Sequence, residues 1–391
     1  MKKFILAKIY LVVVLIIYTS NIFAQTYNIG HTSTDFYDNA RNRNIATEIY
    51  YPSDTNGDNV PISIGNFPII VFGHGFLMSW DSYDNFWNSL VPEGYILCFP
   101  TTEMGFAPNH QFFAEDLSFI ATKMQMESQN SSSIFYNSVL PKTGILGHSM
   151  GGGASFLAAE NNPNINTIVN FAAAETNPSA ILAASNITIP SLIFSGEDDC
   201  VAPPVSHQNI LFDSLNSNCK TQINIISGGH CYFANENVLC SFGESSCNPN
   251  LNILRSEQQS VTNDFLKIWL NFSLKSDISS FTIFNDSLQS SSRITYSQYC
   301  NGTGIVSQNR VDEINIYPNP VTEILNIDVP LEFIDGNLVF LNMFGQELHK
   351  EIITNKLTEI NLSNFESGSY FMILKNEAVV KKNKIIKVVQ Y

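Results

Sequence analysis

The clearest chemical signal in the sequence is the segment Gly147-His148-Ser149-Met150-Gly151. The apolar run Thr143–Leu146 before it predicts a buried strand, and the alanine-rich stretch Met150–Glu160 predicts a helix. Glycines on both sides of the serine permit a sharp strand-to-helix turn that exposes the hydroxyl. The pattern favours Ser149 as a nucleophile, and the alternative is an ordinary serine in a glycine-rich helix cap.

A serine hydroxyl is a weak nucleophile, so a base must take its proton and an acid must orient that base. His230 follows the predicted strand Gln222–Ile226 and a short glycine-containing loop, which predicts that it is the base. Asp199 lies in the loop after the predicted strand Pro190–Phe194, between a glycine three residues before and a proline four residues after. It is the expected acid, and the neighbouring Asp198 is the alternative.

A tetrahedral intermediate needs two backbone N–H donors. Met150, directly after the nucleophile, should supply one. Phe76 should supply the other, because Gly73-His74-Gly75-Phe76 follows the predicted strand Pro68–Phe72. Aromatic residues in the same loops are candidates to line an apolar acyl or aryl site, with packing in the core as the alternative: Trp80, Tyr232 and Phe233.

Short apolar runs alternate with amphipathic stretches from Ile45 to about Phe272. This alternation predicts an α/β fold with a mostly parallel central sheet, covered by helices on both faces and closed by a helix at Ser256–Phe272. We place this catalytic domain at residues 25–275. Residues 276–311 are rich in Ser, Asn, Thr and Gln, which predicts a linker, ordered in part around Cys300. Short alternating segments in residues 312–391 predict a small all-β sandwich.

The chain has 391 residues, of which 44% are hydrophobic and 14% are charged, enough to bury a sizeable core. Its net charge of −15 argues against binding to nucleic acid. Lys2 and Lys3, an apolar run at about Phe4–Tyr18 and small residues up to Ala24 predict a secretory signal peptide at residues 1–24. That run is shorter than the ~20 residues of a spanning helix, and no later segment is apolar enough, so no stable membrane span is expected.

Export makes disulfides plausible for a chain with seven cysteines. Cys98 lies in the apolar run Tyr95–Phe99, which predicts a buried free thiol. The pairing of the other six is open among 15 connectivities. A local Cys240–Cys247 bridge is one option, and a Cys200–Cys231 bridge that would join the two catalytic loops is another. Zinc is the rival use of these cysteines, but no Cys-x-x-Cys pair supports it, and no metal is expected.

With these residues in place, the stretch from Tyr27 to Phe272 resembles the α/β-hydrolases of the dienelactone hydrolase group. Gly-His-Gly-Phe at 73–76 resembles chlorophyllases and platelet-activating-factor acetylhydrolases. Gly-His-Ser-Met-Gly-Gly-Gly at 147–153 and Asp-Cys-Val-Ala-Pro at 199–203 resemble the cutinase-like polyester hydrolases. The latter resemblance implies an oxyanion role for Phe76 and a disulfide between the Asp and His loops. The polyester hydrolases carry a tryptophan where this chain has Phe171–Glu175, so ester hydrolysis is implied more strongly than polyester cleavage.

The carboxyl-terminal segment resembles the sorting domain of the type IX secretion system of Bacteroidota. The shared motifs are Tyr-Pro-Asn-Pro at 317–320, Phe-Gly-Gln-Glu at 344–347, Leu-Ser-Asn-Phe at 362–365 and the basic end at 381–384. The resemblance implies that residues 312–391 engage the secretion machinery and direct the protein out of the cell or to its surface. This step follows transport across the inner membrane, which the signal peptide directs. A carbohydrate-binding or adhesive sandwich is the alternative.

Together these features predict a secreted serine ester hydrolase that needs no metal or organic cofactor and acts on a small-molecule or polymeric ester. A peptidase or lactonase with the same three residues is one alternative. A non-catalytic surface adhesin is another.

Overall fold

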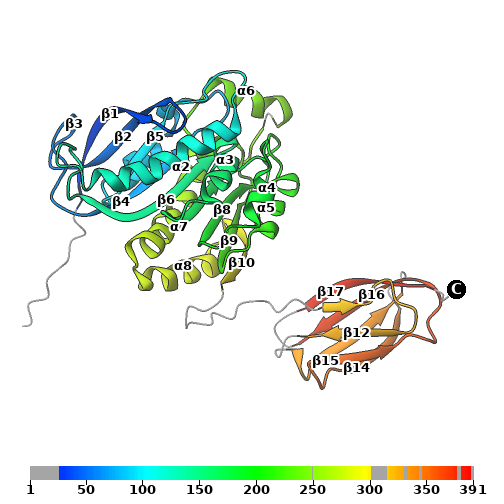
Figure 1. The fold of residues 1–391 in the computed structure, drawn as a ribbon. Coiled ribbons are helices and arrows are strands. Elements are labelled where there is room, and N and C mark those ends of the chain that lie inside the picture. The colour runs from blue at the N-terminus through cyan, green and yellow to red at the C-terminus, as the bar shows by residue number, and fades with distance from the viewer. Residues whose placement is uncertain are drawn as a thin grey trace, which may run out of the picture. The chain divides into compact units, whose positions relative to one another are not determined.

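The computed structural model describes residues 26–248, 250–300, 315–329, 333–342, 346–376 and 380–388. The predicted signal peptide lies outside these ranges. The chain divides into two compact units, Met1–Thr303 and Gly304–Tyr391 (Figure 1).

The first unit is built on one sheet with the strand order β10-β9-β8-β7-β6-β4-β5-β2-β1-β3. Strands β5, β4, β6, β7, β8 and β9 run parallel, and β1, β2 and β10 add antiparallel edges, as predicted for a mostly parallel sheet. The strands are β1 (Asn28–Asp38), β2 (Arg43–Ser53), β3 (Gly57–Asp58), β4 (Phe67–Gly73), β5 (Ile96–Pro100), β6 (Val139–His148), β7 (Ile165–Phe171), β8 (Ser191–Gly196), β9 (Cys219–Ile225) and β10 (Ile294–Cys300).

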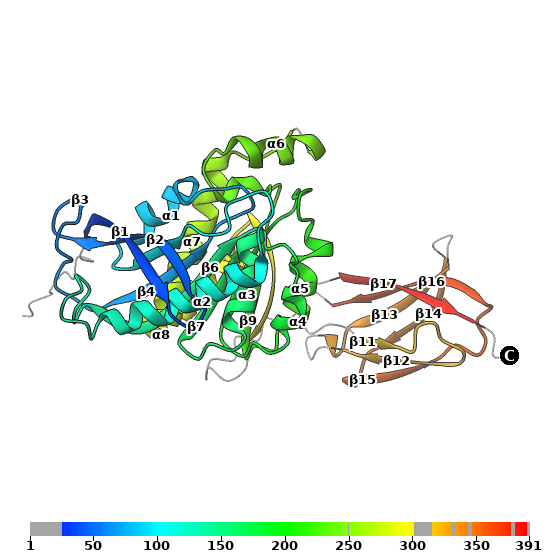
Figure 2. The ribbon, with the colours of Figure 1, turned by 45° about the horizontal axis from the view of Figure 1, so that its top comes forward.

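Strands β4, β5 and β8 are buried along their whole length because helices cover both faces of the sheet. In β4, Ile69 and Val71 pack into one core, whereas Ile70 and Phe72 pack into the other. The first core is closed by α2 (His110–Glu127), α3 (Met150–Ala159), α4 (Ala180–Ala184) and α5 (Gln208–Ser214). The second is closed by α1 (Asp84–Leu90), α7 (Arg255–Lys275) and α8 (Ile278–Ser290), which are all labelled in Figure 2.

The predicted linker is wrong for residues 278–290, which form α8, whereas the order expected around Cys300 is present as the edge strand β10. Phe281, Phe284 and Leu288 form one buried face of α8 against α7 and so extend the second core. The sequence appears polar because only that face is buried, and because every second residue of β10 is exposed. The remainder of the predicted linker, residues 301–311, lies outside the described residues.

The second unit is all β, as predicted. One sheet has the order β11-β12-β15 and the other β14-β13-β16-β17. The strands are β11 (Asn315–Tyr317), β12 (Ile324–Asp328), β13 (Asn337–Leu341), β14 (Glu347–Ile352), β15 (Leu357–Asn361), β16 (Gly368–Lys375) and β17 (Val380–Lys387). A separate core that includes Leu325, Phe340 and Met372 stabilises this unit. Among the described residues of both units, no helix is long and apolar enough to cross a membrane.

Candidate active site

Ser149 occupies the turn between β6 and α3 in a backbone conformation that is unusual for a residue with a side chain. Its φ is 54° and its ψ is −118°. Two backbone hydrogen bonds hold it there: its N–H donates to the Phe171 carbonyl at 3.0 Å, and its carbonyl accepts from the Ala174 N–H at 3.0 Å. The neighbouring strand β7 thus supports a strained turn that exposes the hydroxyl at the carboxyl end of the sheet.

The glycines around Ser149 are required by close backbone contacts. A Cβ atom on Gly147 would overlap the carbonyl of Gly151, and one on Gly151 would overlap the carbonyl of Gly73. Gly73 and Gly147 are also register partners in the parallel pair β4 and β6. The turn after β4 and the turn after β6 are therefore in direct contact.

The structure brings the three predicted side chains together. His230 Nε2 lies 2.9 Å from Ser149 Oγ, and His230 Nδ1 lies 2.8 Å from Asp199 Oδ2. His230 and Asp199 are only 2% and 3% exposed. Because a carboxylate only accepts hydrogen bonds, the neutral imidazole carries its proton on Nδ1 and accepts the serine O–H at Nε2. This is the arrangement in which a histidine can remove a proton from a serine.

Asp199, rather than Asp198, orients the histidine. The second oxygen of Asp199 accepts N–H groups from Val201 at 2.9 Å and Ala202 at 2.8 Å, so the carboxylate has one possible orientation. Asp198 uses its backbone N–H to bind the Gly228 carbonyl, and its carboxylate makes no hydrogen bond among the described residues. Of the two carboxylates, only that of Asp199 contacts the imidazole, and its role as the acid stays a prediction.

The loop that carries His230 is fixed by two polar residues that the sequence analysis missed. Gln258 forms a pair of 2.9 Å hydrogen bonds with the N–H and carbonyl of Gly229. Glu244 is 3% exposed and accepts the Cys231 N–H at 3.1 Å. Burial raises the pKa of Glu244, although hydrogen bonds from the loop backbone oppose that rise. Neither residue belongs to a recognisable motif, so no signal in a single sequence identifies them.

Helix α6 (Val238–Cys247), which projects from the rest of the unit in Figure 2, is joined by disulfides to the loops that carry Asp199 and His230. Cys200, next to Asp199, pairs with Cys247, and Cys231, next to His230, pairs with Cys240. The Cys240–Cys247 and Cys200–Cys231 pairings considered above are therefore wrong. Seven residues along a helix span about 10 Å, beyond the roughly 7 Å Cα separation that a disulfide permits. The two loops are linked through α6 instead.

The remaining cysteines lie away from these loops. Cys219 pairs with Cys300 across β9 and β10, whose register places the two residues opposite each other. Cys98 is a buried free thiol, as predicted, and burial raises its pKa above the usual range.

The two predicted oxyanion donors lie in the expected turns. Met150 begins α3, and Phe76 follows Gly75 in the turn after β4. Within the described part of the chain, neither backbone N–H donates a hydrogen bond to another group. Both remain available to a ligand. The Phe76 side chain is 47% exposed, so it also provides apolar surface beside the turn.

The predicted substrate-binding aromatics have mainly structural partners. Phe233 is fully buried against Phe171 and Phe194, so its prediction as a binding residue is wrong: the ring completes the core beneath the site. Trp80 is half-buried and packs against Trp87, with ring centroids 5.6 Å apart. Tyr232 is half-buried beneath a guanidinium group (Arg255). A binding role for Trp80 and Tyr232 stays a prediction.

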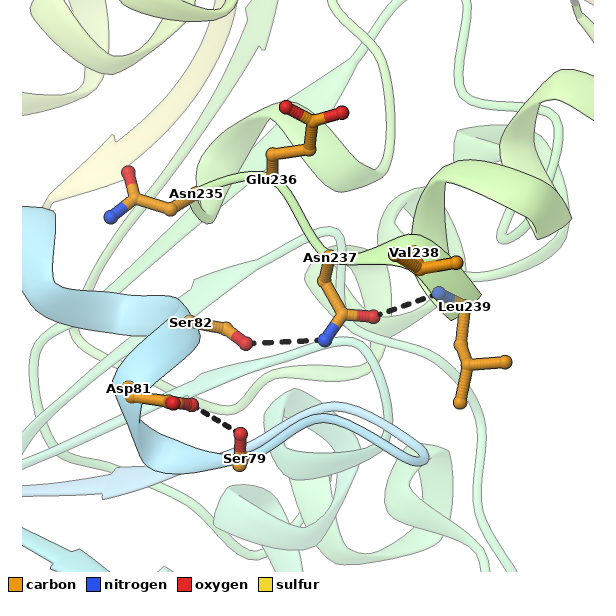
Figure 3. A pocket seen from close by; sticks show the side chains of 8 residues that line it. All are labelled: Ser79, Asp81, Ser82, Asn235, Glu236, Asn237, Val238 and Leu239. Atoms are coloured by element: carbon orange, nitrogen blue, oxygen red, sulfur yellow. Dashed lines mark hydrogen bonds between the residues drawn. The ribbon is translucent and has the colours of Figure 1, made fainter.

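The segment after His230 borders a pocket of about 420 Å³ beside η1 (Trp80–Tyr83), which Figure 3 shows. Asn237 donates from its side chain to Ser82 Oγ at 3.2 Å and caps the first turn of α6 with its oxygen. The Asn235 backbone N–H donates to the Ser82 carbonyl at 2.8 Å. These bonds fasten the segment after the histidine to the segment after the Phe76 turn.

A parallel sheet with a serine after β6, an aspartate after β8 and a histidine after β9 defines an α/β-hydrolase. The family model described as PET hydrolase-like matches residues 35–245, more than half of the chain. The protein therefore belongs to the PET hydrolase-like family of ester hydrolases.

A second family model, described as a secretion system C-terminal sorting domain, matches residues 315–388 and so covers the β-sandwich unit. This domain marks the protein for export by the type IX machinery to the exterior or the cell surface.

Proposed function

We propose that this protein is an exported serine hydrolase that cleaves carboxylic esters through an acyl-enzyme, with Ser149, His230 and Asp199 as its catalytic residues. The observation that carries the proposal is the pair of hydrogen bonds that joins the serine to the histidine at 2.9 Å and the histidine to the aspartate at 2.8 Å. Membership of an ester hydrolase family supports the choice of substrate bond.

In the first half of the cycle, Ser149 Oγ bonds to the ester carbonyl carbon while its proton passes to His230 Nε2. The negative oxygen that forms is stabilised by the N–H groups of Phe76 and Met150. Asp199 stabilises the charged imidazole without taking its proton. The bond from carbon to the alkoxy oxygen then breaks, and His230 donates its proton to the departing alcohol.

In the second half, water attacks the acyl-enzyme. His230 takes a proton from the water, and the second tetrahedral intermediate collapses with return of that proton to Ser149. The products are a carboxylic acid, an alcohol and free enzyme, so no oxidant, reductant or co-substrate other than water is consumed.

The test is Ser149→Ala, assayed with p-nitrophenyl butyrate and with a fluorophosphonate probe. We expect turnover to fall by at least about 10⁴-fold and labelling to disappear, with an unchanged circular dichroism spectrum. Full activity of this variant would refute the proposal. A panel of acyl chain lengths, a lactone, an amide and a polyester film then defines the substrate.

A further inference from the structure

A chain of buried hydrogen bonds joins the turn after β4 to the loop after β9. The Gly75 N–H lies 2.7 Å from Tyr83 Oη, Tyr83 Oη lies 3.0 Å from His148 Nδ1, and His148 Nε2 lies 2.9 Å from the His230 carbonyl oxygen. Tyr83 and His148 are fully buried. Neither residue takes part in the mechanism proposed above.

The donor and acceptor at each link follow from the chemistry of the groups. A carbonyl oxygen only accepts, so His148 Nε2 carries a proton and donates it to His230. Burial, reinforced by the nearby His230, lowers the pKa of His148 to about 3, so its ring is neutral and Nδ1 accepts from the Tyr83 hydroxyl. The Tyr83 oxygen then accepts the Gly75 N–H. The sulfur of Met78, 3.3 Å from that oxygen, is a weaker acceptor than the imidazole.

Each end of the chain adjoins a part of the catalytic apparatus. Gly75 immediately precedes Phe76, one of the two proposed oxyanion donors. His148 immediately precedes Ser149, and His230 is the proposed base. A side chain on Gly75 would intrude on this network, since its Cβ would lie 3.1 Å from both His148 Nδ1 and Tyr83 Oη.

We propose that Tyr83 and His148 are positioning residues, which hold the Phe76 N–H and the His230 imidazole at fixed places around the Ser149 hydroxyl. The inference rests on the proposed serine mechanism. Errors of about 1 Å in the placement of catalytic groups lower rates by roughly 10²-fold. Because both residues are buried behind the site, the network should affect the rate of the chemical step and leave substrate affinity unchanged.

The main test is Tyr83→Phe, with Tyr95→Phe as its matched control. Tyr95 is also a buried tyrosine with one hydroxyl partner, Asn271 Oδ1 at 2.8 Å, but it lies at the amino-terminal end of β5, the end opposite to the site. We expect both variants to lose thermal stability, and Tyr83→Phe to lose more, because it leaves two buried groups unpaired where Tyr95→Phe leaves one. Only Tyr83→Phe should lose kcat, by about 10-fold or more, with KM changed by less than about threefold.

A second pair of variants tests the His148 arm. Glutamine at position 148 places an N–H₂ group near the former Nε2 and can still donate to the His230 carbonyl, whereas leucine cannot. We expect His148→Gln to retain at least about 10-fold more kcat than His148→Leu.

The outcomes separate this inference from the proposed function. If wild type is active but Tyr83→Phe turns over at the rate of Tyr95→Phe, or if His148→Leu equals His148→Gln, the positioning role is refuted and the serine mechanism stands. Full activity of Ser149→Ala would instead remove the proposed function and this inference with it.

Discussion

Replacement of Asp199 by asparagine should disable His230 while leaving the shape of the site unchanged. The outcome depends on which way the new amide points. One oxygen of Asp199 accepts N–H groups from Val201 and Ala202, at 2.9 Å and 2.8 Å. If the amide N–H₂ took that place, donors would face donors and both bonds would be lost. The asparagine oxygen therefore stays there, and its N–H₂ group faces His230 Nδ1.

That orientation forces the imidazole into the wrong tautomer. Nδ1 must now accept, so the proton moves to Nε2, which can no longer take the proton of Ser149. Restoring the productive tautomer removes a hydrogen bond to a charged group, worth about 1.5–3 kcal/mol, and leaves buried donors unpaired at a cost of about 1–3 kcal/mol. The sum of about 3–6 kcal/mol corresponds to a loss of roughly 10² to 10⁴ in kcat.

The assay is kcat for p-nitrophenyl butyrate, corrected for the fraction of enzyme that reacts with a fluorophosphonate. Asp198→Asn is the matched control. It removes the same charge at the adjacent position, and the Asp198 carboxylate makes no hydrogen bond among the described residues. It should change kcat by less than about twofold. If Asp199→Asn kept a tenth of wild-type kcat, or if the control lost as much, the assignment of the acid would be wrong.

Three further changes test the surroundings of the site. Gly151→Ala should abolish folding or activity because its Cβ would overlap backbone of β4, whereas Gly243→Ala, with open space around it, should do neither; soluble yield and kcat decide. Loss of Cys200–Cys247 or of Cys219–Cys300, which close 47- and 81-residue separations, should each lower the free energy of unfolding by about 4 kcal/mol, but only the first should lower kcat. Equal effects on kcat would contradict the idea that the Cys200–Cys247 disulfide holds the Asp199 loop in place. Burial lowers the pKa of His148 to about 3. On acidification the unfolded chain therefore protonates this histidine before the folded protein does, which lowers the free energy of unfolding. From pH 7 to pH 5, urea titrations should show wild type losing about 2 kcal/mol more stability than His148→Gln, and parallel losses would refute the buried neutral ring.

The proximity of the three residues proposed as catalytic could be predicted from the sequence because each follows a buried strand. Apolar runs before Ser149, Asp199 and His230 indicated three strands of one parallel sheet, and the carboxyl ends of such strands share an edge. Proximity of residues 81 positions apart thus followed from topology. The same reasoning placed Phe76 and Met150 in adjacent turns.

The prediction failed where local composition conceals partial burial. In α8 and β10 the exposed face is rich in Ser, Thr and Gln, so the segment resembled a linker, although its other face is packed. Glu244 and Gln258 were missed for a different reason. Each is a polar residue whose structural role depends on hydrogen bonds to backbone groups distant in the chain, and a single sequence does not reveal such a pairing.

Helix α6 shows most clearly why the disulfides could not be predicted. Its ten residues include Gly243 and three serines, and a helix of that length is marginal in water without tertiary support. No periodicity therefore predicted it, and without the helix nothing excluded a bridge between Cys240 and Cys247. The helix, in turn, is stabilised by the two disulfides and by the buried Glu244, which attach it to the loops of Asp199 and His230. The helix and these two loops hold one another in place, so we expect oxidation of these cysteines and assembly of the candidate site to occur together.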